Sequence, residues 1–272
     1  MQQRRVAQNA VEIKGLHFSY GDLQVLRGLS LNIPRGQVVA ILGGSGSGKS
    51  TLLKIIGGQL RPEAGSVTIE GKNVHELDSD ALYKLRLEIG MMFQTSGLFS
   101  DMNVYENVAF PIRENFHLPE ELVRRLVLTK LHAVGLRGAS RLLPTALSGG
   151  MARRVALARS IALDPQLMLY DEPFTGLDPI SFGVIVRLIR RLNDSMGATS
   201  IIVTHDVQEA LGVVDYVYFM AAGRVIARGT PDEIRASDEP FVNQFVNGRR
   251  DGPVPFHYPA PAYGADLELA AA

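Results

Sequence analysis

Cysteine is absent from this 272-residue sequence, and neither sign of charge is in excess. Without cysteine the chain has no disulfides, no thiolate metal sites and no cysteine nucleophile, and the composition fits a reducing compartment. Lysine plus arginine and aspartate plus glutamate number 28 each, so the broad basic surface of a nucleic-acid-binding protein is missing. We therefore expect no nucleic-acid partner, while a local basic patch stays open.

Long hydrophobic runs are missing as well. No apolar run reaches the roughly 20 residues that a membrane helix requires, and the polar and basic residues 1–5 do not lead into an apolar signal core. We expect a soluble protein whose membrane role would come through a partner. Hydrophobic residues still make up 46% of the chain, which is enough for the core of one large domain or two modest ones.

A glycine-rich loop separates the apolar run 38–42 from a helical pattern that ends at Gly57. Strand, loop and helix together fit the pattern GxxxxGK[ST], whose glycines let backbone N–H groups surround a β-phosphate. The lysine of this pattern reaches the β- and γ-phosphates, and the hydroxyl after it can coordinate Mg²⁺. A flexible linker is the alternative, which the flanking strand and helix disfavour. The residues assigned to this ATP site are Gly43, Gly44, Ser45, Gly46, Ser47, Gly48, Lys49, Ser50 and Thr51.

The remaining pattern predicts an α/β fold. Alternating apolar residues in 11–35, continued at 66–72, predict an antiparallel β layer ahead of the main sheet. Apolar strands then alternate with helical patterns, which implies a largely parallel sheet covered by helices on both faces. Residues 97–138 carry helical patterns and no good strand, so we expect a helical insertion at about residues 95–160.

Local signals predict where several helices begin and end. One helix opens at Pro119, which two acids follow, and closes at Gly135. Its buried stripe is expected at Leu122, Leu126, Val127, Leu131 and Val134. A further helix is expected over 206–212, and a capping box at Thr230 is expected to open a terminal helix. From Arg249 onward the chain is predicted to be a tail.

Two acidic residues, Asp171 and Glu172, follow the apolar strand 167–170. The carboxyl end of a parallel strand faces the crevice in which α/β sheets bind ligands. Asp171 is expected to hold Mg²⁺ through water, and Glu172 to orient and polarise the attacking water. Alone, such a pair is often an ordinary surface turn. Together with the glycine loop, it indicates the second half of a Mg-ATP site.

A second glycine motif, Ser148, Gly149 and Gly150, leads into another helical pattern. The free N–H groups at the start of that helix would form a second anion site. If two chains pair head to tail, this motif can close on the γ-phosphate held by the partner's glycine loop. The alternative is a helix cap at Ser148 with a glycine hinge.

The order of these motifs resembles the ATP-binding subunit of ABC transporters over about residues 11–246. The resemblance implies a P-loop NTPase with an N-terminal antiparallel β layer, a RecA-like core and a helical subdomain in residues 1–246, followed by a tail in 247–272. It also implies a homodimer that sandwiches ATP. In that dimer, Ser148 and Gly150 would contact the partner's γ-phosphate and Asp178 would lie at the seam.

The same resemblance implies roles for other residues. Tyr20 would stack on the adenine, and Gln94 would sense Mg²⁺ and the γ-phosphate. His205 would hold the γ-phosphate and the attacking water, although a lone histidine after a strand is more often a capping or surface residue. The implied catalytic residues are Glu172, His205 and Gln94, and the implied metal ligands are Ser50, Gln94 and Asp171.

The chain departs from the family pattern at Met151, where glutamine is usual. Phosphate contacts would come from Ser148 and backbone N–H groups, so ATP binding should survive. Residues 97–108, 147–154 and 251–260 resemble the ATPases of bacterial phospholipid transporters that work with MCE proteins. This implies three partners: an integral membrane permease, an MCE-domain protein and a small STAS-domain subunit. It also implies a peripheral position on the cytoplasmic face of the inner membrane and a role in outer-membrane lipid asymmetry.

Other functions stay open at this point. An ATPase for importing amino acids or other small solutes would share the same ATP site. A soluble ABC ATPase that acts on nucleic acid or the ribosome usually carries two cassettes or long insertions, and this chain has neither. A scaffold that never hydrolyses ATP is disfavoured by Glu172 and His205.

The C-terminal tail has two interpretations. Its proline-rich composition is typical of a disordered end. By the resemblance, we expect Phe256, Tyr258 and Tyr263 to dock on the other subunit, so that deleting 249–272 would weaken assembly and leave the ATP site intact.

Overall fold

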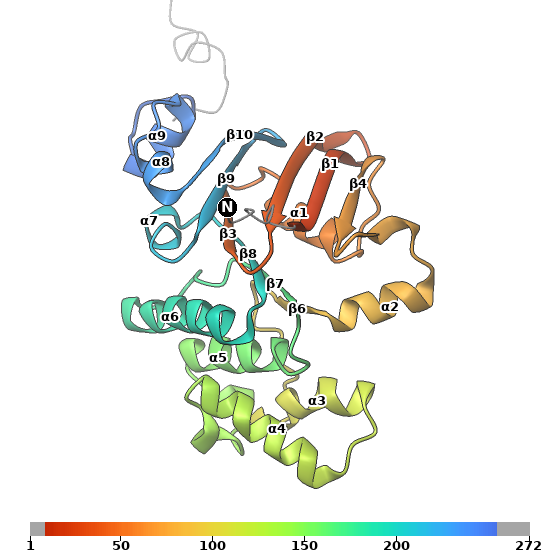
Figure 1. The fold of residues 1–272 in the computed structure, drawn as a ribbon. Helices are drawn as coiled ribbons and strands as arrows, with labels where there is room; N and C mark the ends of the chain where they lie inside the picture. Colours follow the sequence, from red (N-terminus) through yellow and green to blue (C-terminus); the bar gives the residue numbers. More distant parts are fainter. Residues whose placement is uncertain (1–8, 255–272) are drawn as a thin grey trace, which may run out of the picture.

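The computed structural model describes residues 9–254, which form two β-sheets and the helices around them (Figure 1). The smaller sheet is antiparallel, with the strand order β2-β1-β4-β5. Its strands are β1 (Asn9–Tyr20), β2 (Leu23–Pro34), β4 (Ala64–Ile69) and β5 (Lys72–Asn73). The predicted N-terminal antiparallel layer is therefore confirmed.

The larger sheet has the strand order β10-β9-β3-β8-β7-β6. Its strands are β3 (Val38–Gly43), β6 (Ile89–Met92), β7 (Leu167–Asp171), β8 (Thr199–Thr204), β9 (Tyr216–Ala221) and β10 (Arg224–Gly229). Neighbouring strands are parallel except β9 and β10, which are antiparallel. The expectation of a largely parallel sheet is confirmed.

Alternate residues of the central strands face two separate cores. Val38, Ala40 and Leu42 of β3 belong to the core that the helices α5 (Gly149–Ser160) and α6 (Pro179–Met196) cover. Val39 and Ile41 belong to the other core, beneath the smaller sheet and α1 (Lys49–Ile56). Side chains alternate along a strand, so a strand buried on both faces must be apolar throughout. This explains the unbroken apolar run before the glycine loop.

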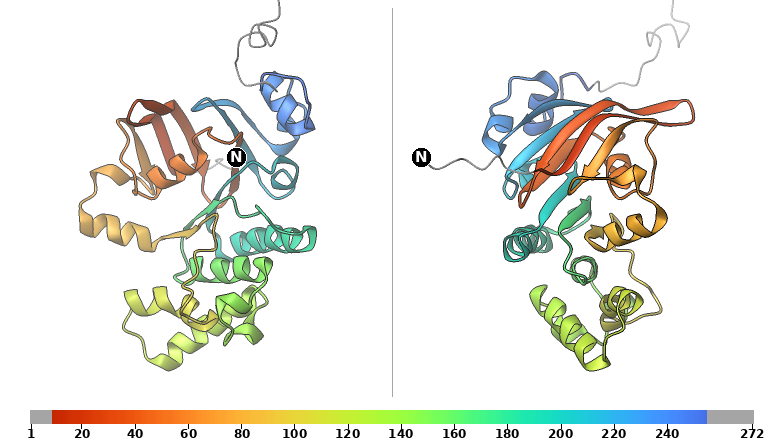
Figure 2. Two further views of the ribbon diagram at one scale, coloured as in Figure 1. Left: turned by 180° about the vertical axis from the view of Figure 1, so that it is seen from behind. Right: turned by 45° about the vertical axis from the view of Figure 1, so that its right-hand side comes forward.

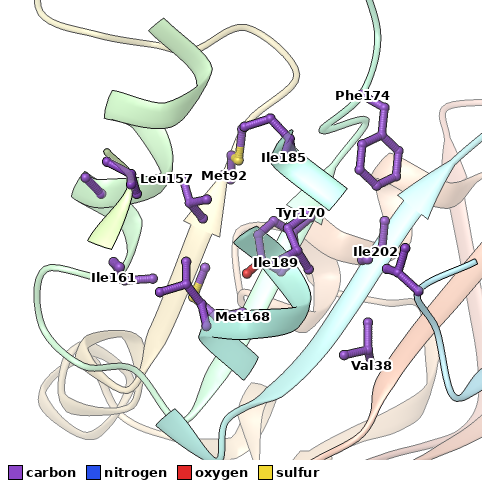
Figure 3. Close-up of a cluster of buried hydrophobic side chains, with 14 of the residues drawn as sticks. Val38, Met92, Leu157, Ile161, Met168, Tyr170, Phe174, Ile185, Ile189 and Ile202 are labelled. Atoms are coloured by element: carbon purple, nitrogen blue, oxygen red, sulfur yellow. The ribbon is translucent and has the colours of Figure 1, made fainter. Parts of the chain in front are cut away.

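The first of these cores fixes α5 and α6 against the sheet (Figure 3). Leu157 of α5 and Ile161, the residue that follows α5, lie over Met92 and Met168, and Ile185 and Ile189 of α6 lie over Tyr170. A buried aliphatic side chain of this size contributes roughly 1.5–3 kcal/mol. The start of α5 is thereby held at a set position relative to the ends of β6 and β7.

The remaining helices lie in different parts of the molecule. The other helices are α2 (Ser79–Leu87), α3 (Val104–Asn115), α4 (Glu120–Ala133), α7 (Val207–Ala210), α8 (Pro231–Arg235) and α9 (Pro240–Asn247). Three short 3₁₀ turns lie at Val74–Glu76, Arg137–Ala139 and Pro144–Ala146. Helices α3 and α4 lie at the end of the molecule opposite the smaller sheet, with α5 between them and the larger sheet (Figures 1 and 2). None of the helices in residues 9–254 has the length and apolar character needed to cross a bilayer.

The predicted stripe on α4 is partly wrong. Leu122 is 45% exposed, and the neighbouring Val123 is buried in its place. Successive helix positions are rotated by about 100°, so the buried series with Val127 and Leu131 runs through Val123 at four-residue spacing. Both Leu122 and Val123 are apolar, and it is Val123 that packs into the core shared with α3 and α5.

The C-terminal helices also differ from the prediction. The capping box at Thr230 is present but opens only α8, and the unpredicted α9 follows it. Glu239 caps α9 and precedes Pro240, and a residue before proline disfavours helical geometry. The chain therefore breaks between the two helices. Helix α7 is shorter than the predicted 206–212, and Phe256, Tyr258 and Tyr263 of the tail lie outside the described residues.

Gly90 in β6 lies where a side chain has no room. A β-carbon at this position would lie 2.5 Å from the carbonyl oxygen of Ser160 and 2.8 Å from Cγ of Pro165. Because a backbone carbonyl cannot move aside as a flexible side chain can, Gly90→Ala should lower the free energy of unfolding by roughly 1–3 kcal/mol. Urea unfolding measures this change. Gly138→Ala is the control, since a β-carbon there meets no atom within 4 Å, and equal losses in both variants would contradict the prediction.

Candidate active site

Four adjacent parallel strands, β3, β8, β7 and β6, carry predicted site residues at their carboxyl ends. The glycine loop follows β3, and Asp171 is the last residue of β7. His205 follows β8, and Gln94 lies two residues after β6. The carboxyl ends of parallel strands meet at one edge of a sheet, where such folds bind ligands. The topology thus gathers residues that are far apart in the sequence.

The glycine loop joins β3 to α1 and contains positions that only glycine tolerates. Gly43 has a φ of 149°, and a β-carbon on it would collide with the carbonyl oxygen of Met220. Gly48 has a φ of 99°, and a β-carbon on it would lie 2.9 Å from Cδ2 of Leu26. Helix α1 begins directly afterwards, so its unpaired N–H groups face the loop. The loop has the shape and polarity of an anion cradle.

Lys49 is only 6% exposed, and its ammonium group binds the loop itself. Nζ donates hydrogen bonds to the carbonyl oxygens of Gly43 at 2.8 Å and Gly44 at 2.9 Å. Burial lowers the pKa of Lys49, and the carboxylates of Glu172 and Asp171 oppose that shift. A cation is thereby enclosed at the centre of the cradle.

Asp171 links the glycine loop to β7. Its Oδ1 accepts a hydrogen bond of 2.8 Å from Oγ of Ser50. Burial raises the pKa of Asp171, and the hydrogen bond from Ser50 acts in the opposite direction. A hydroxyl and a carboxylate side by side are oxygen donors of the kind that Mg²⁺ prefers. These two residues could hold a metal ion.

Glu172 is held by several contacts at the start of the loop that follows β7. Its Oε2 accepts a hydrogen bond of 3.0 Å from Oγ1 of Thr204 and lies 2.9 Å from Nδ1 of His205. Its backbone has a φ of 47°, and its N–H donates to the carbonyl oxygen of Val203 at 2.9 Å. A left-handed conformation in a non-glycine residue persists only where the surroundings enforce it. The carboxylate is therefore fixed in one place beside His205.

A cavity of about 700 Å³ lies over these residues, in the size range of small-molecule sites. The glycine loop, Gln94, Glu172 and His205 border it. Tyr20 also lines it and is 47% exposed, so part of the side chain is available to a ligand. The structure therefore brings the predicted residues on this side of the molecule together around one space.

Three further residues border this cavity that the sequence did not reveal: Leu23, Val25 and Phe245. Leu23 and Val25 lie in β2 just after the turn at Tyr20, so their proximity follows from that of Tyr20. Phe245 comes from α9 and stacks on Phe241 with an interplanar angle of 11°. The signal that could have found its helix is Pro240 at the first helical position together with Gly248 just after the last one.

The Ser148 motif and Asp178 do not border this cavity. Ser148 caps α5, with its Oγ accepting a hydrogen bond of 3.3 Å from the N–H of Met151. Asp178 caps α6, with its Oδ1 accepting one of 3.0 Å from the N–H of Ser181. A β-carbon on Gly150 would lie 2.7 Å from Cβ of Ser181, so the two helices begin side by side. Within one chain, these helix starts are separate from the glycine loop.

Residues 26–175 match the family model described as ABC transporter, and this stretch contains the glycine loop, the Ser148 motif and the acidic pair at Asp171. The chain belongs to the ABC transporter family. It is an ABC ATPase, and the predicted fold class and ATP-hydrolysing activity are confirmed.

Individual relatives of this ABC ATPase cover nearly its whole length. The intermembrane phospholipid transport system ATP-binding protein MlaF of Haemophilus influenzae is 53% identical over 260 residues, which are 96% of this chain and 98% of that protein. The probable ribonucleotide transport ATP-binding protein mkl of Mycobacterium leprae is 43% identical over 245 residues, which are 90% of this chain and 71% of that protein. The predicted resemblance to lipid-transport ATPases is thereby confirmed.

Solved ABC ATPases share the fold. The dimeric structure of a post-hydrolysis state of the ATP-binding cassette MJ0796, bound to ADP and Pi, has a TM-score of 0.74 and 33% identity. The similarity extends over 81% of this chain and 98% of the chain of MJ0796. The β-sheets and helices described above are thus those of a P-loop ABC ATPase.

Proposed function

We propose that this ABC ATPase drives a transporter that moves phospholipids between the inner and outer membranes of a bacterium and so maintains outer-membrane lipid asymmetry. The observation that carries the proposal is the 53% identity, over nearly the full length of both chains, to a phospholipid transport ATP-binding protein. The identity to the probable ribonucleotide transport protein is lower, at 43%, and covers 71% of that protein. We therefore assign phospholipid, and not a ribonucleotide, as the class of cargo.

The residues of the cavity fit ATP. The Ser47 hydroxyl is buried and has no hydrogen-bond partner among the described residues, and Lys49 has only loop carbonyls to bind. A phosphate in the loop would satisfy the hydroxyl and turn the ammonium group toward it, because buried polar groups gain most from a charged partner. The exposed ring of Tyr20 would stack on the adenine.

The residues around Asp171 fit Mg²⁺. Ser50 and Asp171 would hold the ion, and Gln94 would approach it from the end of β6. Bound there, Mg²⁺ would neutralise charge on the phosphates. Glu172 would orient the attacking water, and His205, 2.9 Å from its carboxylate, would steady both that water and the γ-phosphate.

The Ser148 motif would act on the ATP of a second copy. It does not border the cavity of its own chain, yet it presents free N–H groups at a helix start beside Asp178. The dimeric form of a solved relative supports this arrangement. In the proposed homodimer, Ser148, Gly149 and Gly150 of one protomer close on the γ-phosphate held by the other, with Asp178 at the seam.

A second surface supports docking to a membrane partner. A groove of about 580 Å³ lies between β6 and α3, and Met91, Phe93, Phe110 and Pro111 are among its lining residues. An apolar segment of an integral permease would fit there, so closure of the dimer would reach the permease through the helical subdomain. An MCE-domain protein and a small STAS-domain subunit complete the proposed complex, peripheral to the cytoplasmic face of the inner membrane.

Capture of the tagged chain from native membranes tests the cargo. Mass spectrometry of the captured proteins and lipids should find the permease, the MCE-domain protein, the STAS-domain subunit and phospholipid. Lys49→Ala is the matched control, because it should capture the same partners without turning over ATP. A complex that lacks phospholipid and an MCE protein and carries a ribonucleotide or another small solute would overturn the lipid proposal.

A further inference from the structure

Arg153 in α5 is a buried cation that the site described above does not use. It is 7% exposed, in the second turn of the helix that Ser148 caps. Burial lowers its pKa, and no carboxylate acts on it within residues 9–254. An unpaired charge in such a place costs stability, so its presence calls for another explanation.

The guanidinium group of Arg153 joins two loops of the ATP site. Its Nη1 donates to the carbonyl oxygen of Phe93 at 3.0 Å, and its Nη2 donates to that of Thr175 at 3.2 Å. Phe93 begins the loop of residues 93–99, the Gln94 loop. Thr175 lies in the loop of residues 172–178, the Glu172 loop, which runs from Glu172 to Asp178. One side chain therefore sets the distance between the residue next to Gln94 and the middle of the Glu172 loop.

A second arginine of α5 holds the Gln94 loop from its other side. Arg159 donates to the carbonyl oxygens of Gly97 at 2.8 Å and Ser96 at 3.2 Å, and its guanidinium lies 5.5 Å from the ring centre of Phe99. Gln94 is thus bracketed by bonds from one helix. Only Arg153 of the two also reaches the Glu172 loop.

The hydrogen bonds of Arg153 can fix the positions of the two loops because α5 is itself fixed. Leu157 and Ile161 pack against Met92 and Met168 in the core below (Figure 3). A rigid helix with a planar guanidinium group in a fixed fork defines a geometry more sharply than a flexible side chain would. A movement at the start of α5 therefore reaches both loops together.

We propose that Arg153 is a positioning residue for ATP hydrolysis, which holds the Gln94 loop and the Glu172 loop in register with the Ser148 motif of its own chain. This inference rests on the proposed hydrolysis of ATP at the site built by these loops. Arg153 is not among the residues that border the cavity of the ATP site. It acts through the loops that carry Gln94 and Glu172.

The first test is Arg153→Met, which keeps an unbranched apolar stem in place of the aliphatic part of the side chain and removes the guanidinium. Misplaced catalytic groups typically cost on the order of 10- to 100-fold in rate, so we expect kcat for phosphate release to fall by about that factor. The Kd for ATP, measured by equilibrium binding in a Glu172→Gln background, should change little, because Lys49 and the glycine loop are untouched. Arg153→Lys, which can keep one of the bonds, should restore part of kcat.

A matched control is Arg86→Met. Arg86 also donates to backbone carbonyls, those of Gly57 at 3.2 Å and Gly58 at 3.0 Å, and these hydrogen bonds hold neither the Gln94 loop nor the Glu172 loop. The Arg86→Met substitution should leave kcat unchanged. The melting temperature of Arg153→Met should stay near that of the wild type, since two hydrogen bonds are lost but an unpaired buried charge is removed as well. A lower melting temperature with unchanged kcat would show a structural role only and overturn the proposal.

Two further measurements separate positioning from general destabilisation. In a Gln94→Ala background, Arg153→Met should reduce kcat by a smaller factor than in the wild type, and an equal factor would contradict action through the loop. Amide hydrogen exchange should rise in both loops for Arg153→Met, in the Gln94 loop alone for Arg159→Met and in neither for Arg86→Met. Exchange does not depend on ATP turnover. An inactive wild type would therefore refute the proposed hydrolysis, whereas unchanged exchange in Arg153→Met would refute this inference.

Discussion

Lys49→Ala is expected to reduce ATP turnover to the limit of detection while the chain stays folded. Lys49 supplies the enclosed cation of the glycine loop, with Nζ at 2.8 Å and 2.9 Å from two loop carbonyls. Removing one fixed hydrogen-bond donor to developing charge typically costs on the order of 10²–10³-fold in rate. Removing a full positive charge at the β- and γ-phosphates should cost at least as much. Stability should change little, because the lost hydrogen bonds are offset by the removal of a buried charge.

Phosphate release by the purified chain, alone and in its membrane complex, measures this effect. Lys49→Met repeats the test with the volume of the side chain kept, so that a cavity cannot explain the loss. Lys72→Ala, an exposed position in β5, is the control and should retain full activity. Substantial turnover in both Lys49 variants would show that the glycine loop does not hold the reacting phosphates.

Glu172→Gln should give a protein that binds ATP and hydrolyses it extremely slowly. Glutamine has the shape of glutamate and can keep a hydrogen bond with Thr204, but it cannot orient and polarise water as a carboxylate does. Loss of such a group typically lowers rates by about 10²–10⁴-fold. The geometry strengthens this expectation, since a left-handed backbone and the contact with His205 fix Glu172 in place.

This variant also reports on the proposed dimer. With ATP bound and not hydrolysed, Glu172→Gln should elute as a dimer in size-exclusion chromatography with Mg-ATP and as a monomer without it. Adding Ser148→Arg, which places a bulky side chain at the partner's γ-phosphate, should abolish that dimer. Glu63→Gln, at an exposed position, is the activity control. Near-normal hydrolysis by Glu172→Gln would remove Glu172 as the essential group.

The parts of the site that were evident from the sequence are those formed by neighbouring residues. The glycine loop needs a strand, consecutive glycines and a helix start, and all of these lie between Val38 and Ile56. The acidic pair is likewise defined by the strand that it ends. The alternation of apolar strands and helices then predicted the parallel sheet, because a strand buried on both faces has no other composition.

Other features depend on contacts between distant residues and leave no local signal. Phe245 joins the cavity only because α9 packs beside the glycine loop. The choice of Val123 over Leu122 as a buried residue depends on where α3 and α5 lie.

The sequence by itself therefore determined that this chain has an ATP site and which consecutive residues form each motif. Only the tertiary structure decided how the motifs are connected. It separated the Ser148 motif from the glycine loop of the same chain and placed Arg153 between the Gln94 loop and the Glu172 loop. The physical reason is that local motifs follow from backbone geometry and periodicity, whereas the contact of one arginine with two distant carbonyls exists only once the core beneath α5 has formed.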